Sequence, residues 1–178
     1  MTVKRLIPII TLLASLGSAT DAQALSLLWS LENVQFEDGG SATGSFVYDA
    51  DLNSYANISI TTTAGSATTG GTVNLLLDGD ANGAALVPLL GDLTGATLLQ
   101  LLFQTPLTNA GGVVDLVDPF FAPNSSSEGH CSNAACSSAL FSRFMASGDV
   151  VGSPVPVPAT GGLLAAALAG LAVRFRRR

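Results

Sequence analysis

Residues 36–65 read FEDGGSATGSFVYDADLNSYANISITTTAG and contain two runs in which side-chain character alternates, 43–49 and 55–63. The apolar or aromatic members at alternate positions are Phe46, Tyr48, Ile58 and Ile60. Successive side chains of a β-strand point to opposite faces, so this alternation is typical of a sheet with one buried face. We therefore predict that the two runs pair as a hairpin.

Similar runs continue on both sides of this hairpin. The first is 27–36, which is followed by the turn sequence Glu37-Asp38-Gly39-Gly40. The later ones are 72–77, 86–90, 97–103, 113–117 and 141–151. Gly, Asn, Asp and Ser interrupt them at intervals of about ten residues, which is the pattern of an all-β sandwich or barrel.

The leucine-rich segment 93–103 has no clear period, so a short helix is the alternative to a buried strand there. Residues 119–138 are predicted to be irregular. We expect residues 25–153 to form a single all-β, sandwich-like domain of the jelly-roll or lectin-like kind. That length is sufficient for one domain with a real core.

The N-terminus has the three parts of a signal peptide. Lys4 and Arg5 are basic, residues 6–16 are apolar, and Ala22-Gln23-Ala24 has the form of an A-x-A cleavage site. The apolar run is too short to span a membrane. We predict cleavage after Ala24, with residues 1–24 removed, and export through the inner membrane.

The C-terminal segment 154–178 reads PVPVPATGGLLAAALAGLAVRFRRR. The alternating prolines favour an extended chain, so a helix can begin only after Pro158. Residues 159–175 would span about 25 Å as a helix, slightly less than a hydrocarbon core of about 30 Å. We predict a marginal single-pass transmembrane helix. Its cytoplasmic end is marked by Arg174, Arg176, Arg177 and Arg178.

The order of motif, apolar helix and arginines resembles the PEP-CTERM sorting signal of Gram-negative bacteria, in the variant that reads Val-Pro-Leu-Pro-Ala. The matching residues are Val155, Pro156, Val157, Pro158 and Ala159, with valine in place of leucine. The resemblance implies recognition by an exosortase, which removes the tail and releases or transfers the body. An ordinary tail anchor is the alternative. Residues 36–65 are also similar to an opening hairpin of exosortase-sorted proteins, which implies no catalytic activity.

The charge of the body is strongly one-sided. Residues 25–153 contain twelve of the thirteen acidic residues and only one of the seven basic ones, Arg143, which gives a net charge of −11. A body with one cation cannot neutralise phosphates, so nucleic acid is excluded as a partner. Such acidity is suited to solubility outside the cell or to the binding of divalent cations.

Two loops have the pattern D-x-D-x-N, 49–53 and 78–82. Oxygen ligands at alternate positions are used by calcium-binding loops, and Gly83 follows the second loop as such loops require. The pattern is incomplete, because Leu89 stands where a bidentate Glu belongs. Plain turns are the favoured interpretation. The alternative is a Ca²⁺ site formed by Asp78, Asp80 and Asn82; no other cofactor is predicted.

Cys131 and Cys136 are the only cysteines, and an exported protein meets an oxidising compartment. We expect them to form a disulfide. His130 precedes Cys131, but the paired spacings of a zinc site are missing and a bridged cysteine cannot act as a nucleophile. No catalytic residue is predicted.

The expected function is that of a non-catalytic structural or interaction protein. It would be exported to the cell envelope, the cell surface or the extracellular matrix, with exopolysaccharide or biofilm as its surroundings. Its partners would be the exosortase and, transiently, the inner membrane. The alternative is a secreted carbohydrate-binding or carbohydrate-active protein sorted by the same tail. Exposed aromatic residues would favour that alternative, but Trp29, Tyr48 and Tyr55 lie on predicted strands and are expected in the core.

Overall fold

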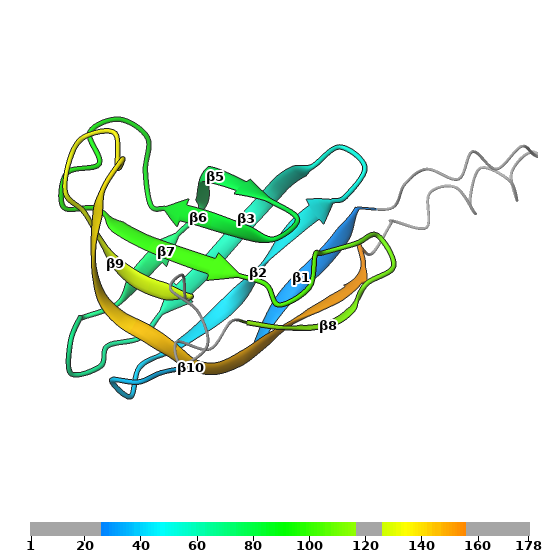
Figure 1. The fold of residues 1–178 in the computed structure, drawn as a ribbon, viewed down its shortest axis with the longest axis horizontal. Coiled ribbons are helices and arrows are strands. Elements are labelled where there is room, and N and C mark those ends of the chain that lie inside the picture. The colour runs from blue at the N-terminus through cyan, green and yellow to red at the C-terminus, as the bar shows by residue number, and fades with distance from the viewer. Residues whose placement is uncertain (1–25, 117–125, 156–178) are drawn as a thin grey trace, which may run out of the picture.

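The computed structural model describes residues 26–116 and 126–155 (Figure 1). This part of the chain contains strands and no helix, so the prediction of an all-β body is confirmed. The strands are β1 (Leu27–Phe36), β2 (Ser41–Asp49), β3 (Ser54–Thr62), β4 (Gly71–Val73), β5 (Leu75–Asp80), β6 (Gly83–Val87), β7 (Thr97–Leu102), β8 (Gly112–Asp115), β9 (Ser127–Cys131) and β10 (Ala139–Pro154).

The strands form one antiparallel path in the order β4-β3-β2-β1-β10-β9-β7-β6-β5, and β8 also pairs with β10. Strand β10 bends this sheet over itself, because its first part pairs with β9 and its second part with β1 (Figure 1). Strands β4 and β5 are separated only by Asn74, yet β4 pairs with β3 and β5 with β6. The bend in β10 and the change of partner at Asn74 together make the sheet barrel-like and nearly closed.

Neighbours in this sheet are mostly neighbours in the chain, which is an up-and-down order. A jelly roll is instead built from two Greek keys. The strand order therefore supports a barrel-like all-β body. The sandwich-like, jelly-roll or lectin-like description stays a prediction.

Several predicted elements need correction. The predicted strand 72–77 is divided at Asn74 into β4 and β5. Strand β6 covers 83–87 and not 86–90, because Pro88 has no N–H to continue the ladder. The leucine-rich segment is strand β7, so the helix alternative is wrong. Strand β9 lies inside 119–138, which was predicted to be irregular. Its sequence, SEGHC, has no apolar alternation, and its pairing with β7 and β10 creates the strand.

The main core lies between two halves of the sheet, one formed by β1 to β4 and the other by β5, β6, β7 and β9. Trp29 and Tyr48 are buried in it, as predicted. Tyr55 is half-buried, with its ring centroid 4.7 Å from that of Tyr48 and 5.3 Å from that of Phe46. The predicted inward residues Phe46 and Ile60 are both fully buried. These four aromatic residues therefore pack the core and do not form an exposed platform, whereas Phe141 is 43% exposed.

A second, smaller apolar cluster lies on the outer face of β6, β7 and β9. Leu98 belongs to it whereas Leu99 belongs to the main core, and adjacent strand residues point to opposite faces. The loops 88–96 and 132–138 join over this cluster, where the Leu93 amide donates to the Ala134 carbonyl at 3.0 Å. The disulfide described below is part of it.

Candidate functional site

The second acidic loop, 78–82, forms the tip of the β5–β6 hairpin. Asp80 pairs with Gly83 across the turn, and its carboxylate accepts the Asn82 amide at 2.7 Å. This is the local side-chain bond by which Asp stabilises a turn. The side chains of Asp78, Asp80 and Asn82 are all exposed. One of the two carboxylates predicted as a calcium ligand thus already bonds its own turn.

The first acidic loop, 49–53, connects β2 and β3. The buried carboxylate of Asp49 accepts the amides of Asp51 and Leu52 at 3.0 and 3.1 Å, and the Ser26 hydroxyl at 3.1 Å. The Leu52 amide is the main reason that the pKa of Asp49 lies below its usual value. Asp49 therefore closes a turn and fastens the start of β1 to it.

Within residues 26–116 and 126–155, no three His, Cys, Asp or Glu side chains come close enough together to share a metal ion. A calcium site at Asp78, Asp80 and Asn82 stays the alternative to a plain turn, and thermal melting distinguishes the two.

A shallow depression of about 270 Å³ lies on the outer face of β5, β6 and β7. Two cross-strand rows build it. In one row Ala85 stands between Asp78 and Gln100, and in the other Gly83 stands between Asp80 and Leu102. Each row has its smallest member on the central strand β6, so the longer side chains of β5 and β7 form the two walls. We call this depression the β6 trough.

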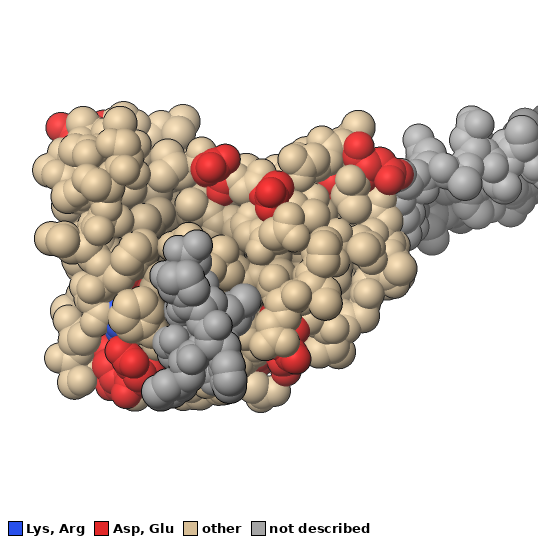
Figure 2. Space-filling model, viewed as in Figure 1, with Lys and Arg blue, Asp and Glu red and all other residues tan. Residues whose placement is uncertain are grey.

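The polar side chains of the β6 trough are available to a ligand. Among the described residues, the side chains of Asp78, Asn82 and half-buried Gln100 have no hydrogen-bond partner. No Lys or Arg lines the trough. Figure 2 shows acidic side chains as separate patches on the visible face and almost no basic surface. The trough therefore offers carboxylate acceptors and amide donors without a positive charge.

Arg143, the single cation of the body, is completely buried. Its Nη1 donates to the two carboxylate oxygens of Asp38 at 3.2 and 3.3 Å. Its Nη2 donates to Glu128 at 2.8 Å and to the Thr63 carbonyl at 2.9 Å. The guanidinium carbon lies 3.9 Å from the centroid of the Phe36 ring, which adds a cation–π contact. Arg143 thereby connects β9, the β1–β2 turn and the end of β3.

Burial alone would raise the pKa of Asp38. The amides of Gly40 and Ala67 and the guanidinium of Arg143 outweigh it, so the pKa of Asp38 lies below its usual value. Arg143 Nε and Glu128 Oε1 are buried without a partner among the described residues. This cluster is closed to ligands and is structural. No local sequence pattern indicates this cluster, although a lone cation in a body of net charge −11 is a signal that could have been used.

A row of three carboxylates crosses β1, β10 and β8, where Asp149 pairs with Glu32 on one side and with Asp115 on the other. The hydrogen bond with Asp115 is the main reason that the pKa of Asp149 is raised, and burial adds to it. Like charges directly opposite each other on neighbouring strands are destabilising. The row is therefore a source of repulsion at neutral pH.

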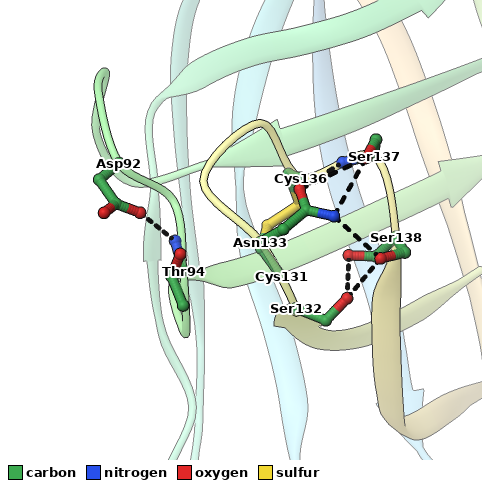
Figure 3. The surroundings of a disulfide bond; sticks show 8 residues. All are labelled: Asp92, Thr94, Cys131, Ser132, Asn133, Cys136, Ser137 and Ser138. Atoms are coloured by element: carbon green, nitrogen blue, oxygen red, sulfur yellow. Dashed lines mark hydrogen bonds between the residues drawn. A yellow bond between two sulfur atoms is a disulfide. The ribbon is translucent and has the colours of Figure 1, made fainter.

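The predicted disulfide between Cys131 and Cys136 is confirmed. Figure 3 shows it inside a loop in which the Asn133 amide donates to Ser137 and Ser138, both at 3.0 Å. His130 is exposed beside it and pairs with Leu140. Because both sulfurs are bridged, the cysteines hold the loop and neither is a free nucleophile.

The two ends of the body lie side by side, since Leu27 of β1 pairs with Pro154 of β10. Val155, the first residue of the sorting motif, is half-buried directly after β10. The other predicted processing residues lie outside the described part of the chain: Ala22, Ala24, Pro156, Val157, Pro158, Ala159, Arg174, Arg176, Arg177 and Arg178. No helix in the described ranges is long and apolar enough to cross a membrane.

Comparison of the chain with models of protein families, with curated proteins and with solved structures found no match in any of the three. Any functional conclusion therefore rests on the residues of this chain alone.

Proposed function

We propose that the protein is an exported envelope or extracellular-matrix protein of a Gram-negative bacterium, processed at its C-terminus by an exosortase. Its body has a structural or interaction role, with exopolysaccharide or biofilm as its surroundings, and the PEP-CTERM-like tail directs it there. Before processing, the chain crosses the inner membrane once through residues 159–175. A sandwich-like body of the jelly-roll or lectin-like kind is part of the same proposal.

The observation that best supports this proposal is the pairing of Leu27 with Pro154. Ser26 follows the predicted signal peptide closely, and Val155 begins the sorting motif. Both flanking segments thus join the body at the same end. A folded body with both ends on one side can stand beside the membrane while the C-terminal segment crosses it.

The proposal is tested by replacing the four C-terminal arginines with serine, because the positive residues hold the cytoplasmic end of the helix. We expect unprocessed precursor to accumulate, or the whole chain to pass through the membrane, in a strain that expresses the matching exosortase. Fractionation and immunoblotting of cells and medium measure this. Wild-type processing of the serine variant would contradict the proposal.

The alternative is a carbohydrate-binding or carbohydrate-active protein sorted by the same tail. The β6 trough is the feature of the described residues to which this alternative applies, because it holds two carboxylates, Asp78 and Asp80. A glycosidase needs two carboxylates that flank the scissile bond. A glycan array and a hydrolase screen separate binding from turnover.

A further inference from the structure

We propose that the β6 trough is a binding site for one sugar residue of a neutral or amino-substituted polysaccharide. This inference rests on the proposed location of the protein at the surface or in the matrix and adds a ligand class to it. The shape of the trough, the chemistry of its lining and its charge all support this ligand class.

The shape is fixed by the register of three strands. Ala85 and Gly83 occupy the middle of the two rows, and longer side chains stand on each side of them. A larger residue is excluded at Gly83, where an added Cβ would lie 2.7 Å from the Leu101 carbonyl and 2.9 Å from the Leu102 side chain. At about 270 Å³ the trough is close to the lower limit of ligand pockets, about 300 Å³, so it fits a single ring.

The hairpin that carries the first wall is also held in place. The Tyr55 hydroxyl donates to the Asp80 carbonyl at 2.7 Å, and the Asn82 amide donates to the Asp80 carboxylate. Tyr55 extends from β3 on the opposite half of the sheet. The wall is therefore fixed before a ligand arrives, which lowers the entropy lost on binding.

The lining fits a ring that carries several hydroxyl groups. The Asp78 carboxylate can only accept hydrogen bonds, whereas the side-chain amides of Asn82 and Gln100 can both donate and accept. A sugar hydroxyl also does both. Leu102 adds an apolar side wall against which the C–H groups of a ring can pack.

The charge of the lining limits the ligand further. Asp78 and Asp80 carry two negative charges, and no cation lines the trough. An acidic sugar would have to bring its carboxylate toward them, which is unfavourable at short range. A neutral hexose is accepted, and an amino group would gain a charge-assisted hydrogen bond. We therefore expect the trough to reject uronic acid polymers.

The test uses the full-length chain, produced in a bacterium and purified in detergent, with three probes: cellohexaose, a chitosan hexamer and oligogalacturonate. Calorimetric titration should give saturable binding of the neutral or the amino-sugar hexamer and none of the uronate. Loss of a hydrogen bond to a charged group changes affinity about tenfold or more, so Asp78→Asn should weaken binding by that factor.

Ala85→Leu places a larger side chain on the floor of the trough and should abolish binding. Gln100→Ala should weaken binding. Asp51→Asn is the matched control, because it removes one exposed charge in the other acidic loop and should leave affinity unchanged. Thermal melting verifies that each variant is folded.

The proposal is overturned if no hexamer binds, if oligogalacturonate binds as well as the others, or if the Asp78, Gln100 and Ala85 variants bind as wild type does. Processing of the C-terminus is measured separately by mass. A failure of the sugar-binding proposal can therefore be distinguished from a failure of the sorting proposal.

Discussion

Arg143 of β10 and Glu128 of β9 form a hydrogen-bonded ion pair across 2.8 Å, and both side chains are almost completely buried. The pair lies at the register shift in β10 between Phe141 and Arg143, two residues before the strand changes its partner from β9 to β1. Asp38 joins it from the β1–β2 turn. One buried cation therefore stabilises the bend that makes the sheet barrel-like.

We predict that Arg143→Met is strongly destabilising. Removal of one partner leaves buried charge without compensation, which costs about 3–5 kcal/mol. Urea denaturation measures the loss. The double variant Arg143→Met with Glu128→Met should lose less than the sum of the two single variants, because a matched apolar replacement removes the orphaned charge. A cost of the single variant below about 1 kcal/mol, the value of an exposed pair, would contradict the burial of this cluster.

The Asp149 carboxyl group should make the protein less stable at neutral pH than at mildly acidic pH. Its pKa is raised, so its contribution to stability is present below its unfolded value of 3.8 and is lost as pH rises through the folded value. Asp149→Asn should therefore raise the melting temperature at pH 7 and have no such effect below pH 3.8. Exposed pairs contribute about 0–1 kcal/mol, so we expect an increase of at most a few degrees.

Asp38 and Asp49 provide an internal comparison for the pH dependence expected of Asp149. The pKa values of Asp38 and Asp49 are lowered, so their contributions have the opposite sign and are lost as pH falls through their folded values. Wild type should lose stability below pH 3.8 for this reason. Equal stabilisation by Asp149→Asn at both pH values would show that the repulsion from Asp115 is not responsible.

The disulfide should contribute about 2 kcal/mol, because it closes a loop of only a few residues. Cys131→Ser with Cys136→Ser, or treatment with a reductant, should lower the melting temperature by about 4–9 °C. The second apolar cluster, which contains both cysteines, should become more exposed to a dye such as ANS. An unchanged melting curve after reduction, with free thiols verified, would show that the loop 132–138 is held without the bridge.

Calcium is expected to have no effect on stability. The Asp80 carboxylate bonds the Asn82 amide, as in a plain turn. Melting curves in EDTA, Ca²⁺ and Mg²⁺ at matched ionic strength should coincide. A site with Kd near about 10⁻⁴ M would instead add about 1.4 kcal/mol at about 1 mM Ca²⁺, or about 3–6 °C. Such a shift, absent in Asp78→Ala and Asp80→Ala, would establish the calcium alternative.

Strands with strong alternation were predictable from the sequence. Strand β1 has the predicted bounds, and Phe46, Tyr48 and Ile60 point into the core as their spacing indicates. Strand β9 was not predictable, because a segment of Ser, Glu, Gly and His becomes a strand only through its two neighbours. The same holds for features made by residues distant in sequence. Arg143 and Asp38 are 105 residues apart, so their contact has no local signal.

The trough was partly predictable. The sequence placed Asp78, Asp80 and Asn82 together in one loop, and they do lie together at the hairpin tip. It could not bring Gln100 beside them, because that depends on the register between β6 and β7. Nor could it show that Ala85 and Gly83 form a floor. The small residues have this role only because the flanking strands place longer side chains on both sides.

The central claim, C-terminal processing of an exported chain, is tested most directly by the intact mass of the mature protein from the producing organism. We expect the mass of a chain that begins at Leu25 and ends at the Val155–Ala159 motif, without the apolar helix and the arginines that follow it. Mature protein that still extends through Arg178 would contradict exosortase processing and establish a tail anchor in its place.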